Sequence, residues 1–352
     1  MAARWKWLDP ARMARGVRWR WQAWRGRFNS LPKPATGSSF QRAVLESYGV
    51  TDVTALNGPE RMWAEFRLTA VERGSAAVAL LGGPTAMRGK RVLDVGCAYA
   101  GFLVAARQAG ARRVVGIDVD AELLDLGRLL LADHSVEARL ELADLTDPGA
   151  PGLLGEFDVV FCNDVLEHVL DMEQAAINLA HLLAPRGRLF LEIPNGQAAR
   201  YLQSDGHYQL PGITLLDHAD AKRWFRATHH DQYPYRTYFY APLEYYISLF
   251  SRAGLHLRLL NPPVADASLT EPLAARWDEA IATLRALTAT PEQPTELVTS
   301  IQKRAEEADL GFRRLLETAR SSPTPEERAV AQTTLLTRYG LESFLLEGRK
   351  PV

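Results

Sequence analysis

The chain has 352 residues but only two cysteines, Cys97 and Cys162, which lie far apart in the sequence. This content excludes a disulfide framework and a cysteine-based metal site, and it favours a reduced, cytoplasmic protein. The sequence also lacks an apolar run long enough to cross a bilayer, and its start lacks the continuous apolar core of a signal peptide. We therefore expect a cytoplasmic protein without a membrane span.

The net charge of only −1 at pH 7 argues against nucleic acid as the main partner. The charge is unevenly distributed, however, because residues 1–33 hold nine Lys or Arg, a single acid and five of the eight tryptophans. Apolar residues from Met13 to Leu31 are spaced 4, 4, 3, 4 and 3 positions apart, which predicts one face of a helix. We expect residues 1–36 to form a basic, tryptophan-rich amphipathic segment followed by a linker.

Three roles fit this segment. It can dock on its own domain or on a partner chain, as in a homodimer. It can lie on a membrane surface, where tryptophan prefers the interface and arginine meets anionic headgroups. It can also bind nucleic acid. The membrane interpretation makes the protein membrane-peripheral through residues 1–33, and it fails if a variant lacking them still pellets fully with anionic vesicles.

Strands and helices alternate from Lys90 onward. Apolar runs predict strands at 91–97, 112–119, 138–145, 157–163 and 187–194. Helical patterns lie between them at 101–109, 121–133 and 170–184. This alternation predicts an α/β fold with a parallel sheet covered by helices on both faces.

The remaining segments divide the chain further. We expect N-terminal helices at 37–89, a core at 90–265 and a helical C-terminal segment at 266–352. The core contains an aromatic insertion at 196–241 without a clean period, and "LHLRLLN" after it predicts a sixth strand. In the C-terminal segment, Thr324 and Glu327 form a capping box, and helix is expected to about residue 348. These helices either cover the core or make a dimer contact.

The stretch "RVLDVGCAYAGFLVAARQAGARRVVGIDVD" places a loop of small residues after the first core strand. Ligands of open α/β sheets bind beyond the carboxyl ends of the strands, where Gly96 allows close approach and Asp118 can bind ribose hydroxyls. A dinucleotide-binding loop would have two further glycines that are missing here. Asp94 in this turn suits an amine-bearing ligand and would repel a pyrophosphate.

These residues resemble those of class I S-adenosylmethionine-dependent methyltransferases. The resemblance covers about residues 60–260 and rests on "VLDVGCAYAG", "VVGIDVD", "LELADL", "FDVVFCNDVLEHV" and "LLAPRGRLFLEIPN", in that order. It implies a Rossmann-like fold and S-adenosyl-L-methionine as cofactor. The cofactor-binding residues that it implies are Asp94, Gly96, Cys97, Ala98, Tyr99, Gly101, Asp118, Val119, Asp144, Leu145, Asn163 and Asp164.

Two features depart from that family. Ala98 and Ala100 stand where the family often has glycine, and the methyl group of Ala100 would crowd the cofactor if that position needs a positive φ. The family's seventh, antiparallel strand has no evident counterpart after residue 261.

Asp164, Glu167 and His168 are spaced i, i+3, i+4 and would share one face of a helix that begins here. In one interpretation Asn163 and Asp164 line the methionine end of the cofactor, while the other two order the helix start. In a second, His168 is a base that faces the substrate. A third places a divalent metal at the triplet, which resembles the set in ubiquinone-pathway O-methyltransferases. We expect no metal.

The aromatic insertion carries the more distinctive signal. Eight of the eleven tyrosines and four of the eight histidines lie between Tyr201 and Tyr246. Polar-tipped aromatic side chains suit a hydroxylated acceptor such as a sugar or a phenol. We expect His207 to act as general base, with His168 as the second candidate, and the expected substrate contacts are Tyr208, His218 and Tyr238. Alternatively, these histidines only hold the loop together, and "THHD" at 228–231 lacks a third metal ligand.

The sequence therefore predicts a methyltransferase for an oxygen of a small-molecule or glycan-like hydroxyl acceptor. The alternatives are methylation of nitrogen or of a macromolecule, and a methyltransferase-like scaffold without turnover in which Ala100 blocks the cofactor. An NAD-dependent oxidoreductase fits the loop less well.

Overall fold

The computed structural model describes residues 37–229 and 234–351. The predicted amphipathic helix at 1–33, and His230 and Asp231 of "THHD", lie outside the described residues. Among the described helices, none is both long enough and apolar enough to cross a membrane. The chain divides into two compact units. The sheet unit runs to Glu192 and includes Ile247–Leu260 and residues from Leu345, and the helical unit comprises Ile193–Tyr246 and Asn261–Phe344.

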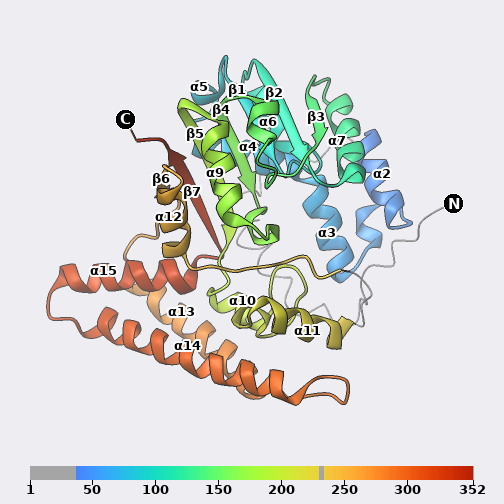
Figure 1. Cartoon of the computed structure of the whole chain (residues 1–352). Coiled ribbons are helices and arrows are strands. Elements are labelled where there is room, and N and C mark those ends of the chain that lie inside the picture. The colour runs from blue at the N-terminus through green and yellow to red at the C-terminus, as the bar shows by residue number, and fades with distance from the viewer. Residues whose placement is uncertain (1–36, 230–233, 352) are drawn as a thin grey trace. The chain divides into compact units, whose positions relative to one another are not determined.

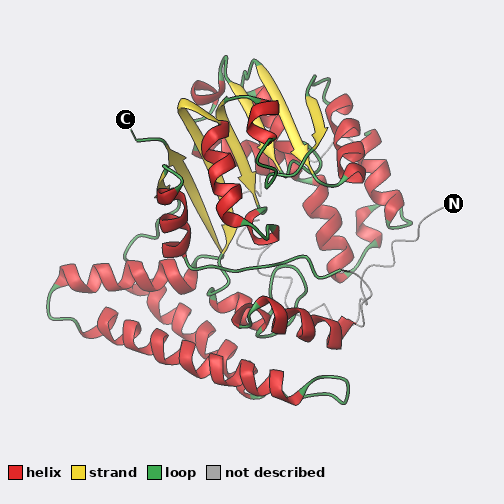
Figure 2. Cartoon of the chain, viewed as in Figure 1, coloured by secondary structure: helices red, strands yellow, loops and turns green. Residues whose placement is uncertain are grey.

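A seven-stranded sheet is the centre of the first unit (Figures 1 and 2). Its order is β3-β2-β1-β4-β5-β7-β6. The strands are β1 (Arg91–Val95), β2 (Arg113–Asp118), β3 (Arg139–Leu142), β4 (Phe157–Asn163), β5 (Leu183–Pro194), β6 (His256–Leu259) and β7 (Ser343–Arg349). Each pair among β1 to β5 that is adjacent in the sheet is parallel, as predicted, and β6 pairs antiparallel with β7. The α/β expectation is confirmed.

Helices cover this sheet and precede it. They are α2 (Ser39–Ser47), α3 (Gly58–Leu68), α4 (Ala70–Leu80), α5 (Pro84–Met87), α6 (Gly101–Gln108), α7 (Ala121–Asp133), α8 (Ala150–Leu154) and α9 (Met172–Leu182), with short turns η1 (Val53–Ala55) and η2 (Leu166–His168). Strand β1 shows why the centre is a parallel sheet: Val92, Leu93 and Val95 are all buried, so both of its faces are covered.

The expectation of helix up to residue 348 is wrong, because residues 343–349 form β7. This strand lies between β5 and β6 and supplies the antiparallel strand that had no evident place in the sequence. Its residues from Phe344 to Gly348 are buried, so it has no polar alternation to mark it as a strand. Gly348 fits tightly, since an added Cβ would lie 3.3 Å from the Leu189 side chain.

A buried charge group ties β7 to its neighbours. The Glu347 carboxylate accepts hydrogen bonds from Arg188 (2.5 Å), Arg258 (2.7 Å) and Arg349 (2.7 Å). Burial alone would raise the pKa of Glu347, but the bonds from the three arginines outweigh it and hold the pKa at about 2. Glu347 is the buried member, whereas Arg258 and Arg349 are largely exposed, so removing the carboxylate mainly leaves the less exposed Arg188 without its partner.

The helical unit contains α10 (Ala199–Gln203), η3 (Ile213–Leu215), α11 (His218–His229), α13 (Ala267–Arg285), α14 (Thr295–Ser321), α15 (Pro325–Leu335) and η4 (Leu336–Gly340). Helix α12 (Leu243–Arg252) connects this part of the sequence with β6. In its core Trp277 stacks on Phe312 at 4.4 Å, and the indole N–H of Trp277 donates to Asp309. The predicted capping box is confirmed in part, because Glu327 N donates to Thr324 Oγ1 at 3.2 Å.

These units differ from the domain boundaries expected from the sequence. The aromatic insertion is grouped with the C-terminal helices rather than with the sheet. Arg304 of α14 donates to the carbonyl oxygen of Leu215, and Gly212 approaches α14 so closely that an added Cβ would lie 2.4 Å from Ile301. The C-terminal helices thus support the aromatic segment.

The Glu347 group predicts a pH-dependent contribution to stability. Because the fold lowers the pKa of Glu347 from about 4.3, its ionised form stabilises the protein above that pH, and the benefit is lost as the pH falls towards 2. We expect Glu347→Gln to lower the free energy of unfolding by about 1–3 kcal/mol at pH 7. Urea unfolding should show this difference shrinking between pH 5 and pH 2.5.

Glu271→Gln is the matched control, since Glu271 pairs with Arg320 on the surface and such pairs contribute less than about 1 kcal/mol. A Glu347→Gln deficit that stays constant across this pH range would contradict the assignment.

Candidate active site

The loop between β1 and α6, residues 96–100, has an unusual backbone. Gly96 (φ +67°), Ala98 (φ 41°) and Ala100 (φ 60°) all lie in the left-handed region. Gly96 is required for a second reason, because an added Cβ would lie 2.4 Å from Val165. Backbone bonds from Cys97 N to Ile117 O (3.0 Å) and from Ala100 N to Cys97 O (2.7 Å) close the turn.

The methyl group of Ala100 does not face a ligand. The position has the positive φ that raised the concern, but the side chain is fully buried and faces Gly127 of α7, where an added Cβ would be 3.4 Å away. An alanine in this conformation costs about 1–2 kcal/mol, which is tolerable in a folded loop. The alanine therefore gives no steric reason for a blocked site.

Gly101 has a packing role. An added Cβ there would lie 2.4 Å from the backbone of Ala70 at the start of α4. Gly74 makes the reciprocal approach, since its added Cβ would lie 2.7 Å from the Cα of Phe102 in α6. Two glycines thus allow α4 to pack directly on α6, the helix that follows the loop.

Asp118 at the end of β2 anchors the loop. One oxygen accepts from the amide of Ala98 at 2.9 Å, and the other accepts from the amide of Asp120 at 3.0 Å. Burial raises the pKa of Asp118, and these backbone bonds oppose the rise. A carboxylate has lone pairs for further donors, so both oxygens can still accept from a ligand.

Asp94 in β1 is a buried carboxyl group that needs a partner. It is only 2% exposed, and its Oδ2 has no hydrogen-bond partner among the described residues. Burial raises the pKa of Asp94 well above its usual range, the charge of Asp118 raises it further, and Arg73 lowers it. A buried carboxylate of this kind calls for a cation or a donor.

Arg73 of α4 supplies positive charge to this site and was missed in the sequence. Its guanidinium lies 3.6 Å from the centre of the Phe66 ring and donates to the Phe66 carbonyl oxygen at 3.3 Å. The available signal was the adjacent Gly74 within a helix, which marks a close contact of α4.

Tyr99 turns towards the N-terminal helices. Its ring lies 5.8 Å from that of Phe40, and the Arg67 guanidinium lies 5.8 Å from its centre. Cys97 is buried, and burial raises the pKa of its thiol, so this cysteine is a packing residue with an unreactive side chain.

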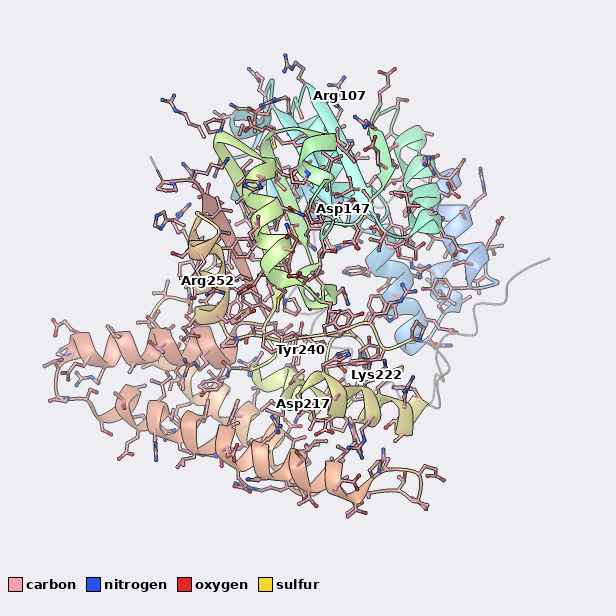
Figure 3. The ribbon with its side chains drawn as sticks, in the orientation of Figure 1. Arg107, Asp147, Asp217, Lys222, Tyr240 and Arg252 are labelled. Carbon is pink, nitrogen blue, oxygen red and sulfur yellow. The ribbon has the colours of Figure 1, made fainter. Side chains whose placement is uncertain are left out.

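Three of the predicted cofactor-binding residues, Val119, Asp144 and Leu145, follow the ends of β2 and β3. Val119 and Asp144 are exposed, and Asp144 accepts from the amide and the hydroxyl of Thr146, both at 2.8 Å. Leu145 is buried, and its carbonyl oxygen accepts from Asn178 of α9 at 2.6 Å. Asn178 also donates to the carbonyl oxygen of Asp147, whose position Figure 3 shows. The two hydrogen bonds from Asn178 therefore fix the loop after β3.

The end of β4 differs from the expectation of a shared helical face, which is wrong. Asp164 has φ 52° and precedes η2, which is only three residues long. The positive φ breaks the helical continuity between Asp164 and the two later residues. Glu167 is fully buried, and His168 Nε2 lies 3.9 Å from its carboxylate. Asn163 donates to Asp164, while its own Oδ1 is buried without a hydrogen-bond partner among the described residues.

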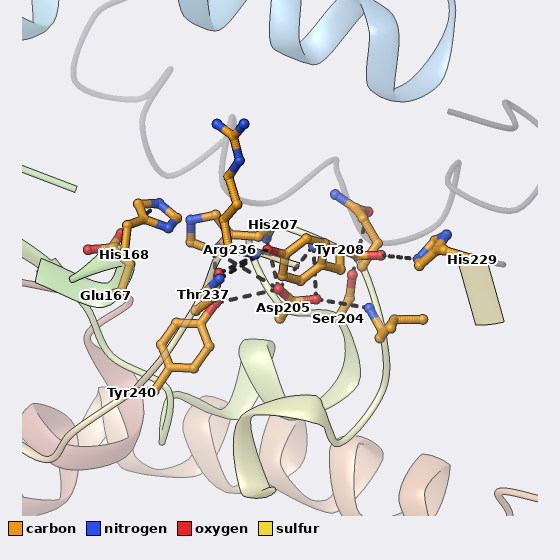
Figure 4. A network of polar contacts seen from close by, with 12 residues as sticks. Glu167, His168, Ser204, Asp205, His207, Tyr208, His229, Arg236, Thr237 and Tyr240 are labelled. Atoms are coloured by element: carbon orange, nitrogen blue, oxygen red, sulfur yellow. Dashed lines mark hydrogen bonds and ion pairs between the residues drawn. The ribbon is translucent and has the colours of Figure 1, made fainter. Parts of the chain in front are cut away.

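In the helical unit, Asp205 organises a second polar group (Figure 4). The buried carboxylate accepts from the amides of His207 (2.9 Å), Tyr208 (3.0 Å) and Leu210 (2.9 Å). The Tyr240 hydroxyl donates to Asp205 at 3.5 Å and lies 2.7 Å from His207 Nδ1. Burial raises the pKa of Asp205, and the backbone bonds oppose the rise.

The other predicted aromatic residues shape the same loop. The Tyr208 hydroxyl accepts from the amides of Arg236 (2.7 Å) and Thr237 (3.2 Å), so it holds the returning chain. His218 donates to the Thr237 carbonyl oxygen and stacks on Tyr238 at 4.8 Å. These contacts favour the loop-holding interpretation for Tyr208 and His218.

Comparison with known proteins identifies relatives of a large part of the chain. A family described as a methyltransferase domain matches residues 65–260. The ubiquinone biosynthesis O-methyltransferase of Thiobacillus denitrificans is 38% identical over 116 residues, covering 33% of this chain and 49% of that protein. That of Xanthomonas oryzae is 30% identical over 175 residues, covering 49% and 69%. The chain thus spans about half the length of the first of these relatives.

A solved structure is also similar. Magnesium protoporphyrin IX methyltransferase from Synechocystis, crystallised with bound SAH, is 21% identical with a TM-score of 0.42. The match covers 67% of this chain and 90% of that one.

The loop geometry predicts that Gly96→Ala is more harmful than a simple change of backbone preference. Left-handed alanine costs about 1–2 kcal/mol, and the 2.4 Å approach to Val165 adds overpacking of about 1–3 kcal/mol. Gly89→Ala is the matched control, because Gly89 has φ +72° and no atom within 4 Å of an added Cβ. Urea unfolding should show the larger loss for Gly96→Ala, and equal losses would contradict the steric argument.

Proposed function

We propose that this chain, which belongs to the methyltransferase-domain family and is an S-adenosylmethionine-dependent methyltransferase, methylates an oxygen of a small-molecule or glycan-like hydroxyl acceptor. The observation that supports this acceptor class is the Asp205, Tyr240 and His207 group in an aromatic-rich segment. A hydroxyl must lose its proton to become a good nucleophile, and a histidine coupled to a buried carboxylate can accept that proton. The names of the O-methyltransferase relatives agree with it.

The residues at the carboxyl ends of the strands fit the cofactor. When bound, S-adenosylmethionine supplies a reactive sulfonium methyl group. Asp94, whose buried Oδ2 has no partner within the described part of the chain, would hold the methionine ammonium, and Arg73 would face the methionine carboxylate. Asp118 would bind the ribose hydroxyls.

The other predicted positions surround these. Asp144 and Leu145 would hold the adenine, next to Val119, and Asn163 and Asp164 would line the methionine end. The loop residues Gly96, Cys97, Ala98 and Tyr99 would contribute backbone groups, in a turn where Gly96 and Ala98 have a positive φ.

His207 is our first candidate for the base, and His168 is the second. The proton of the acceptor hydroxyl passes to the imidazole while the oxygen is methylated. His168 has the buried carboxylate of Glu167 beside it at 3.9 Å. A divalent metal at Asp164, Glu167 and His168 would polarise the acceptor hydroxyl instead. In that case, dialysis against EDTA would abolish methyl transfer.

Methylation of nitrogen or of a macromolecule is the alternative. A neutral amine already carries its nucleophilic lone pair, so it needs no protein base. An amine acceptor would make transfer insensitive to loss of both histidines, whereas a hydroxyl acceptor would not.

The cofactor assignment predicts selective stabilisation by S-adenosylhomocysteine. A ligand that binds only the folded protein adds about 2.7 kcal/mol at a hundredfold excess over its Kd. We expect a thermal shift with this ligand and none with NAD, and we expect Asp118→Ala to abolish it. Asp125→Ala, which removes an exposed carboxylate of α7, is the control and should keep the full shift. An undiminished shift in Asp118→Ala would refute the role of Asp118.

The base assignment predicts a loss of turnover without a loss of cofactor binding. Transfer of a labelled methyl group to a panel of phenols and methyl glycosides should fall about 10²–10⁴-fold in His207→Ala. The thermal shift with S-adenosylhomocysteine should be unchanged. His256→Ala, on the exposed face of β6, is the control. If His168→Ala loses turnover and His207→Ala does not, His168 is the base.

A further inference from the structure

The Asp205 carboxylate accepts more hydrogen bonds than a base at His207 would need. Three backbone amides within six residues converge on one buried carboxylate, in a turn formed by residues 205–210. Such convergence suits the ionised form of the acid despite its burial. Burial raises the pKa of Asp205, and these three bonds oppose that rise beside His207.

Tyr240 joins this charge to the imidazole. Its hydroxyl lies 2.7 Å from His207 Nδ1 and 3.5 Å from Asp205 Oδ2, and Figure 4 shows the three side chains together. Its position is built in, because Gly196 faces it so closely that an added Cβ would lie 2.5 Å from Tyr240 Cβ. Asp205 and Tyr240 are 35 positions apart in the sequence, and the fold brings this phenol close to both the acid and the base.

A single phenolic proton can serve only one of the two neighbours. Either Tyr240 donates to His207 Nδ1, or it accepts from an Nδ1–H and donates to Asp205. The second arrangement fits the charges, because it points the Tyr240 proton at the Asp205 carboxylate, but the 3.5 Å separation is too long for a strong charge-assisted hydrogen bond. The carboxylate also lies 4.0 Å from Nδ1, where its charge stabilises a proton.

We propose that Tyr240 is a positioning residue that holds neutral His207 as the Nδ1–H tautomer, through the relay Nδ1–H to Tyr240 Oη–H to Asp205. This inference rests on the proposed function. Nε2 is then the unprotonated nitrogen, and it takes the proton of the acceptor hydroxyl. No proton moves through Tyr240: the imidazolium keeps its Nδ1–H on the phenol oxygen, and Asp205 balances the new charge.

The test reads the tautomer directly. The full chain, labelled with ¹⁵N-histidine, gives ring-nitrogen chemical shifts that separate the two tautomers, and the His207 signals are assigned by their absence in His207→Gln. We expect Nδ1–H in the wild type and a shift towards Nε2–H in Tyr240→Phe, with at least a tenfold fall in kcat and little change in KM. Phenylalanine keeps the ring, so the variant should fold. Tyr245→Phe, whose hydroxyl is outside the relay, is the control and should leave both readouts unchanged.

Two results would overturn the proposal. One is a wild-type His207 in the Nε2–H form, and the other is an Nδ1–H tautomer that persists in Tyr240→Phe. Because the tautomer is read without turnover, failure of the proposed function is recognised separately. In that case His207→Ala retains methyl transfer while the tautomer result still stands, and the relay survives as a structural feature of the loop.

Discussion

Two buried carboxylates at neighbouring strand ends are the constraint on which the sheet unit depends. Asp94 and Asp118 are both nearly inaccessible, and the charge of Asp118 raises the pKa of Asp94 beyond the effect of burial. Such a pair is destabilising unless donors or cations compensate it. The left-handed loop supplies the amide of Ala98, and the close packing of α4 on α6 brings the charge of Arg73. The glycines at 74, 96 and 101 are the means by which the backbone achieves this.

The parts of the fold predictable from sequence were those set by local patterns. Strands β1, β2, β4 and β5 are bounded by turns and largely buried on both faces, so their apolar runs suffice, whereas β3 at the sheet edge is only partly buried. Strand β7 could not be found in this way, because its partners β5 and β6 are supplied by distant segments and "SFLLEGR" has no alternation. The grouping of the aromatic segment with the C-terminal helices likewise depends on contacts such as Arg304 to Leu215, which leave no mark in either segment.

The site shows the same division. Motif order indicated Asp94 and Asp118, since their positions at strand ends follow from the pattern alone. Arg73 precedes the motif and gains its role only through tertiary packing of α4. The spacing of Asp164 and His168 predicted one shared helical face. That prediction is wrong because a positive φ at Asp164 interrupts the helix. Concern over Ala100 was correct about its backbone and wrong about its consequence, since the side chain faces Gly127.

The histidines of the aromatic segment differ in what lies behind their ring nitrogens. His218 and His229 each donate to a backbone carbonyl, at 3.3 Å in both cases. A carbonyl fixes which nitrogen is protonated, but it carries no net charge to stabilise an imidazolium. Behind His207 stands a hydroxyl that can donate or accept, backed by the buried carboxylate of Asp205. His207 is therefore the one of these three for which we propose proton transfer.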